Sequence, residues 1–224
     1  MIDNKALSNF VFTQFPENII TFILQSIVLI YQDSYDYVFT NFEKEQAIDL
    51  LCNYRRGKIE SFLKLLPNRF PELNVECKIN DSFNSHHIEI GINNIVFTQS
   101  FTQFQDEKVR KAIFRNDLSE FNEQFELEFP EYPIQEKSKK CYAILNHGAD
   151  GREPKRPQFF QLIFPPSNSE NIAAPIDLMK LYNIPANILQ AEIEVMKSKN
   201  DLINPPLKNP GKTGESNNNE HRAS

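Results

Sequence analysis

Apolar residues recur every three or four positions through the first third of the chain, the spacing that places them on one face of an α-helix. Between Glu17 and about Tyr31 they occupy most of the helix circumference, so this segment predicts a helix buried on most sides. Pro16 suits the start of that helix, because its missing N–H has no partner in a first turn. The N-terminal third is therefore expected to be mostly helical.

A second helical run is predicted from Asn41 to Pro67, where the spacing of three to four continues. The aromatic, turn-rich segment 32–40 is expected to separate it from the first helix, and Gly57 is expected to break it in two. Past Pro71 the period changes to two, which predicts a half-buried strand over 73–80.

The clearest local signal is a β-hairpin. His86–Ile92 and Ile95–Phe101 are β-favouring runs separated by Asn93-Asn94, residues that tolerate the positive φ of a tight two-residue turn. That turn sets Ile90 opposite Phe97 on one face, which is apolar. The other face then carries polar side chains.

Helical spacing returns from Gln105 to about Phe125, and β-favouring runs return in Cys141–His147 and Gln158–Phe164. These segments predict a helix followed by a second strand pair. Short helices are expected over 174–182 and 185–199. We therefore predict one α+β domain over residues 5–199, in which N-terminal helices pack on a mostly antiparallel sheet built from hairpins and helices follow the sheet. The Pro-, Asn-, Gly- and Ser-rich segment 200–224 is predicted to be a disordered tail.

Composition limits the function classes. With 40% hydrophobic residues the 224-residue chain can bury a core, and its formal charge of −6 creates no overall basic field for nucleic acid or anionic lipid. Three cysteines, none in a CxxC pair, fit a reducing compartment. The N-terminus lacks the pattern of a secretory signal, and the most apolar stretch, 19–30, is too short to cross a bilayer. We expect a cytoplasmic protein without a membrane segment.

Candidate catalytic residues lie on the polar face of the predicted hairpin. His87 and Glu89 alternate there with the apolar positions, opposite Ser100 and Thr98, so a base, a carboxylate and two hydroxyls come within cross-strand reach. The competing and favoured interpretation is an ordinary solvated sheet face. His147 is a third candidate, because it stands where a strand runs into the Gly- and Pro-rich loop 148–157.

No complete motif supports a metal or cofactor, and none is expected. His87, Glu89 and His147 could form a two-histidine, one-carboxylate site only if the fold gathered them. Glu76-Cys77-Lys78 matches the acid-x-lysine element of many nucleases, but this tripeptide pattern occurs four times in the chain and is weak. P-loop, GxGxxG, GxSxG, HExxH and zinc-finger spacings are absent from the sequence.

Local basic groups are the candidates for phosphate or partner contact. Lys108, Lys111 and Arg115 fall on one face of the helix predicted over 105–125, and Arg152 lies in the 148–157 loop. A solvated helix face is the competing and favoured interpretation of the three helical charges.

We therefore expect a bacterial-type interaction or regulatory protein that binds a protein partner through its sheet face or the 148–157 loop. The alternative is an enzyme acting on nucleic acid or another phosphoester, with His87, Glu89 and His147 in the site and the basic helix face holding phosphate. The two differ in geometry: only the enzyme needs these three side chains in one place beside Lys108, Lys111 or Arg115.

Overall fold

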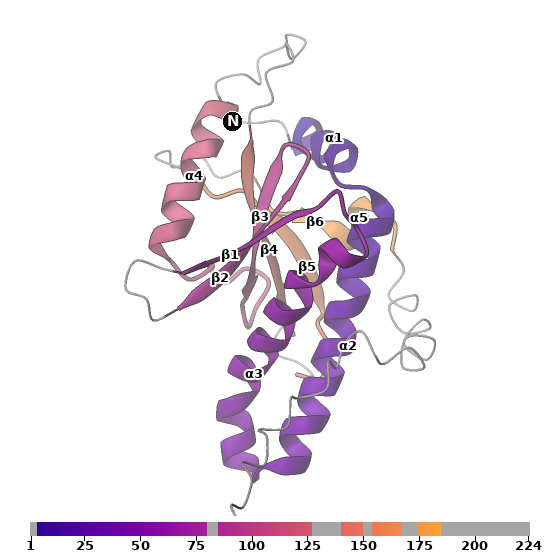
Figure 1. Ribbon diagram of the computed structural model, residues 1–224, viewed down its shortest axis with the longest axis vertical. Helices are drawn as coiled ribbons and strands as arrows, with labels where there is room; N and C mark the ends of the chain where they lie inside the picture. Colours follow the sequence, from indigo (N-terminus) through magenta and orange to yellow (C-terminus); the bar gives the residue numbers. More distant parts are fainter. Residues whose placement is uncertain (1–3, 80–84, 127–139, 150–153, 167–173, 185–224) are drawn as a thin grey trace, which may run out of the picture.

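The fold is α+β, as predicted, in a computed structural model that describes residues 4–79, 85–126, 140–149, 154–166 and 174–184 (Figure 1). The helices are α1 (Asn4–Gln14), α2 (Glu17–Asn41), α3 (Lys44–Lys64), the 3-10 turn η1 (Leu66–Asn68), α4 (Ile113–Glu126) and α5 (Leu178–Leu181). The strands are β1 (Asn74–Ile79), β2 (His86–Ile92), β3 (Ile95–Phe101), β4 (Cys141–Gly148), β5 (Phe159–Ile163) and β6 (Ile176–Asp177).

All described strands form one sheet in the order β1-β2-β3-β4-β5-β6. Neighbours are antiparallel except β3 and β4, which run parallel, with Ile95 opposite Cys141 and Phe101 opposite His147. Parallel neighbours cannot be joined by a tight turn, and α4 lies in the connection between them. The prediction of a mostly antiparallel sheet is confirmed.

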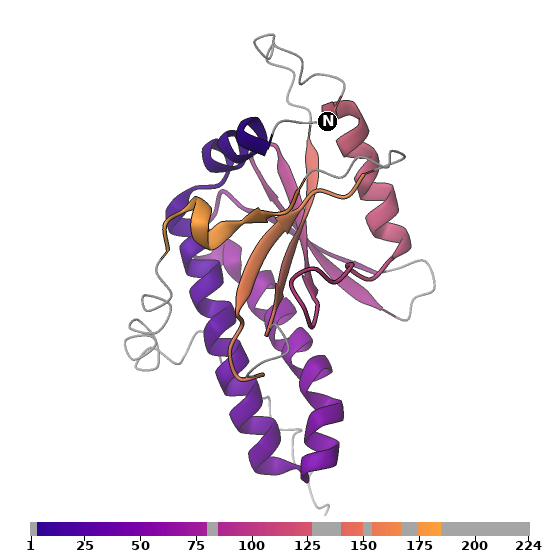
Figure 2. The same cartoon turned by 180° about the vertical axis from the view of Figure 1, so that it is seen from behind.

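Helices cover both faces of the sheet (Figure 2). The main core lies between the sheet and α2, whose apolar residues pack with the odd-numbered positions of β4 and the even-numbered positions of β2. On the opposite face, a smaller apolar cluster joins Leu118 of α4 to Tyr142 and Ile144 of β4. Since strand side chains alternate between faces, each strand divides its residues between these two layers.

The predicted hairpin is confirmed. Ile90 pairs with Phe97 and Ile92 with Ile95, and all four side chains are buried. Asn93 adopts a φ of 47°, the left-handed conformation that the turn requires and that asparagine tolerates. The helix α1 braces the turn, because the Asn93 side chain donates a hydrogen bond to the Gln14 carbonyl.

Two helices run further than their sequence predicted. The segment 32–40 is not a connection: α2 continues through it to Asn41, because Ser34 and Val38 extend its buried face. The predicted break at Gly57 is also wrong. This residue lies within α3 on an open surface, where a glycine costs helix stability without interrupting the helix.

Two later helices begin further along the chain than predicted. Residues 105–112 are not helical, and α4 begins only at Ile113. The segment predicted as a helix over 174–182 begins with the short strand β6, which pairs with β5 before α5 starts. The helix predicted over 185–199 and the tail 200–224 lie outside the described residues.

Within the described part of the chain, no single helix is both long and apolar enough to cross a membrane. The pair Lys5–Gln14 and Glu17–Asn41 passes that test only jointly, across a bend of 91°.

Candidate functional site

A carboxylate on β2 forms the centre of a charged cluster at one edge of the sheet. Glu89 accepts a hydrogen bond from His87 Nε2 at 3.0 Å and pairs through its other oxygen with the Lys78 ammonium at 2.8 Å. Lys78 reaches Glu89 because its strand pairs with β2 in a register that sets Lys78 opposite His87. Hydrogen bonding to Glu89 raises the Lys78 pKa, so the ammonium stays charged.

The His87–Glu89 pair is not on a solvated sheet face. Both residues are buried, and the His87 ring stacks on Phe114 of α4 at 3.7 Å with an interplanar angle of 13°. The solvated interpretation favoured from the sequence is therefore wrong for these two residues, because alternation assigns a residue to a face without telling whether a helix covers that face.

A hydroxyl network continues the polar layer under α4. Thr98 Oγ1 and the Tyr142 hydroxyl lie 2.7 Å apart, and Arg115 in the first turn of α4 also interacts with Tyr142. Burial raises the Tyr142 pKa to about 12, so this phenol is neutral at physiological pH. The Arg115 guanidinium also donates to the Gln99 carbonyl, which ties α4 to β3. This arrangement fastens a helix onto a sheet.

His147 lies on the other face of the sheet, under α2. Its Nδ1 is 2.7 Å from the Tyr31 hydroxyl and its Nε2 is 3.3 Å from Gln99 Oε1. An amide oxygen only accepts, so Nε2 carries the ring proton and the tyrosine hydroxyl donates to Nδ1. Complete burial lowers the His147 pKa to about 3, with the Arg55 charge adding to the effect. The imidazole is therefore neutral, and both of its ring nitrogens are hydrogen-bonded.

Arg55 is the buried charge beside this histidine. Its guanidinium lies over the Tyr31 ring at 3.8 Å, and it donates a hydrogen bond to the Pro154 carbonyl. The burial of Arg55 was not predicted, although the signal is visible: this residue occupies a core position of α3, one turn from the buried Leu51 and Ile59.

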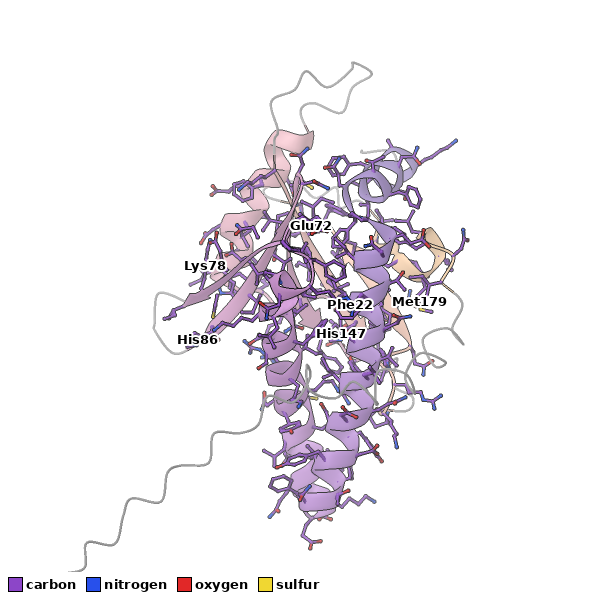
Figure 3. All side chains as sticks on the ribbon, turned by 45° about the vertical axis from the view of Figure 1, so that its right-hand side comes forward. Phe22, Glu72, Lys78, His86, His147 and Met179 are labelled. Carbon is purple, nitrogen blue, oxygen red and sulfur yellow. The ribbon has the colours of Figure 1, made fainter. Side chains whose placement is uncertain are left out.

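The three candidate catalytic residues do not converge. His87 and Glu89 touch each other under α4, whereas His147 contacts Tyr31 of α2. In Figure 3, His147 lies beside the helices and Lys78 lies apart from it, at the sheet edge. Across the described segments there is no cluster of three or more His, Cys, Asp or Glu residues that could hold a metal ion.

The basic residues are also dispersed. Lys108 and Lys111 are exposed in the irregular segment before α4, so the predicted helical stripe with Arg115 does not exist. Arg152 lies outside the described residues. Glu76 and Lys78 do come together, with 3.6 Å between their charged groups, but Lys78 is already engaged by Glu89.

A different surface emerges where α2 and α3 run side by side past the end of the sheet (Figures 1 and 2). Tyr37 and Tyr54 stack there with ring centroids 4.9 Å apart and an interplanar angle of 8°. Leu50 stands one turn before Tyr54 on the same side of α3 and is 40% exposed, and Tyr37 is 47% exposed. We call Tyr37, Leu50 and Tyr54 the hairpin patch, because they lie on the helical hairpin formed by α2 and α3; the β2–β3 hairpin is a separate feature.

The segment that carries the hairpin patch is acidic. Residues 33–54 contain five carboxylates and a single lysine, Lys44. One carboxylate, Asp36, pairs with Lys155 of the 148–157 loop at 2.7 Å. The described end of that loop therefore packs against α2 next to Tyr37. The missed sequence signal was this acidic run with its five aromatic residues.

Comparison with protein-family models, with curated proteins and with solved structures finds no match.

Proposed function

We propose that this protein is a non-catalytic interaction protein whose hairpin patch binds a protein partner. The observation that carries the proposal is the pair of helices projecting past the sheet with Tyr37 and Leu50 exposed. Apolar side chains on a projecting, unpaired surface are typical of protein contacts, and tyrosine is enriched where such contacts are strongest.

The charge around the patch indicates the chemistry of the partner. With five carboxylates and one lysine over residues 33–54, the partner is expected to present Lys or Arg around an apolar centre. The 148–157 loop, expected from the sequence to meet a partner, contributes its described end through the Lys155–Asp36 pair. A sheet face is a less favourable docking surface than the hairpin patch, because the residues of β4 are buried on both sides of the sheet.

The enzyme alternative has less support. It needs His147 beside His87 and Glu89, and these residues lie on opposite faces of the sheet. It also needs a basic helix face, and Lys108 and Lys111 precede the helix.

Photo-crosslinking tests the proposal. A photoreactive residue at Asn53, exposed beside Leu50 and Tyr54, is introduced into the full chain, and the crosslink is made in a lysate of the expressing cells. We expect an adduct with one protein that presents a basic surface, and its yield should fall as salt is raised, because exposed charge attraction is screened. Tyr37→Ser should abolish the adduct.

The matched control is Ile48→Ser, which removes an apolar side chain that is 56% exposed on the same helix but turned away from Leu50. It should leave the adduct unchanged. Thermal melts of both variants confirm that each is folded. No adduct at Asn53, or an adduct that folded Tyr37→Ser retains, contradicts the proposal.

A further inference from the structure

The outer edge of β1 is an unpaired strand edge. It is the first strand of the described sheet, and no described strand pairs with its outer side. Its residues from Glu76 to Ile79 are exposed, and Ile79 is 51% exposed. A strand edge of this kind presents backbone N–H and C=O groups that can pair with another strand.

Alternation divides the β1 side chains by charge. Glu76 and Lys78 lie on the α4 face, where Lys78 meets Glu89, and Val75, Cys77 and Ile79 lie on the α3 face. If a second β1 strand lies antiparallel to the first, Glu76 of each strand can face Lys78 of the other, so the two charged pairs are complementary. The edge therefore carries a sequence that can recognise a second copy of itself.

Strand geometry limits the registers open to such a pairing. In an antiparallel edge pair, only alternate residues turn their backbone groups outward, so opposed residues must both be outward or both inward. Of the six registers centred on a residue of β1, those centred on Glu76 and Cys77 pair five residues of each strand, and the other four pair three or fewer. The registers centred on Glu76 and on Lys78 oppose like charges at the centre, which is unfavourable.

The register centred on Cys77 opposes each residue from Val75 to Ile79 to a compatible residue. It sets Glu76 against the partner's Lys78, Lys78 against the partner's Glu76, and Val75 against the partner's Ile79. A two-fold axis normal to the sheet keeps these pairs on matching faces, as an isologous dimer requires. We propose that β1 pairs with β1 of a second copy of this chain in that register, joining the two sheets into one.

Cys77 makes the proposed register measurable. Directly opposed residues of an antiparallel pair have Cα atoms about 4.5 to 5.5 Å apart, within the range that a disulfide bridges. In the Cys52→Ser chain, which leaves Cys77 exposed and Cys141 buried, diamide should oxidise two Cys77 thiols to one disulfide and itself be reduced to the hydrazine. We expect a covalent dimer on a non-reducing gel, and none after Cys77→Ser.

Charge variants test the pairing without oxidation. Sedimentation of the full chain should show a reversible dimer, and Glu76→Lys or Lys78→Glu should each weaken it about tenfold or more, since each opposes like charges twice. Mixing the two variants should restore a dimer, because one strand is then basic and the other acidic. Glu72→Lys, at an exposed position just before β1 (Figure 3), should leave the dimer unchanged.

The proposal is overturned by a chain that stays monomeric at all concentrations, which would mean that Glu76 and Lys78 protect the edge from pairing. The proposal is equally overturned if Glu76→Lys does not weaken the dimer. It is also overturned if folded Glu76→Lys and Lys78→Glu chains form no dimer when they are mixed. Where Lys78→Glu fails to fold, the Cys77 cross-link and the Glu76→Lys variant decide the question.

Discussion

Tyr31 of α2 and His147 of β4, 116 positions apart in the chain, are joined by a 2.7 Å hydrogen bond between the phenol and the imidazole. This contact crosses the interface between the main helix layer and the sheet. Because His147 is fully buried and the Arg55 charge lies nearby, the imidazole must stay neutral for the core to remain closed.

Stability should therefore depend on pH through His147. Its pKa falls from an ordinary 6.5 to about 3 on folding, so between these values the unfolded chain binds more protons than the native state. The free energy of unfolding should decrease as pH falls from 6.5 toward 3, by up to about 1.4 kcal/mol per pH unit from this group. Urea titrations across that range measure the slope.

The matched variants for this titration are His147→Gln, which removes the group, and His86→Gln, at an exposed histidine. We expect a shallower slope only for the first. An unchanged slope in His147→Gln would show that other groups account for the acid sensitivity.

His87→Ala should destabilise the protein by about 1–3 kcal/mol, because it removes the stack on Phe114 and leaves Glu89 with one fewer hydrogen bond in a buried setting. His86→Ala, at the neighbouring exposed position, should change the free energy of unfolding by less than about 0.5 kcal/mol. Denaturant melts compare the two. If both variants change the free energy of unfolding by the same small amount, the packing of α4 over His87 contributes little to stability.

Phe97→Ala should cost about 3–5 kcal/mol, since this side chain is fully buried opposite Ile90 and packs against Phe15 with ring centroids 5.1 Å apart. Phe104→Ala, at a phenylalanine that is 45% exposed, is the control and should cost far less. A loss below about 1 kcal/mol at Phe97 would contradict the hairpin register.

Two glycines should respond to alanine in opposite directions. A Cβ at Gly148 would lie 2.0 Å from the Thr102 carbonyl oxygen, so Gly148→Ala should destabilise by about 1–3 kcal/mol. A Cβ at Gly57 meets nothing within 4 Å inside α3, so Gly57→Ala should stabilise by about 0.5–1 kcal/mol. Thermal melts measure both, and a loss of stability in Gly57→Ala would show that α3 is interrupted there.

The parts that could be predicted depend on neighbours in the chain. The Asn93-Asn94 turn and its flanking strands determine their own register, and the helical period from Glu17 onward marks a helix whatever lies around it. The helix continuing through 32–40 was missed because propensity is weak there, and the packing of Val38 extends the helix.

The parts that could not be predicted depend on contacts between distant segments. Alternation placed His87 and Glu89 on one face, but only the position of α4 decided that this face is covered. The register of β4 against β3, which sets His147 opposite Phe101, turned His147 away from them into the α2 layer. A sequence pattern reports which side of its own element a residue occupies, whereas burial and convergence arise from how elements pack, and the tertiary structure alone decided both.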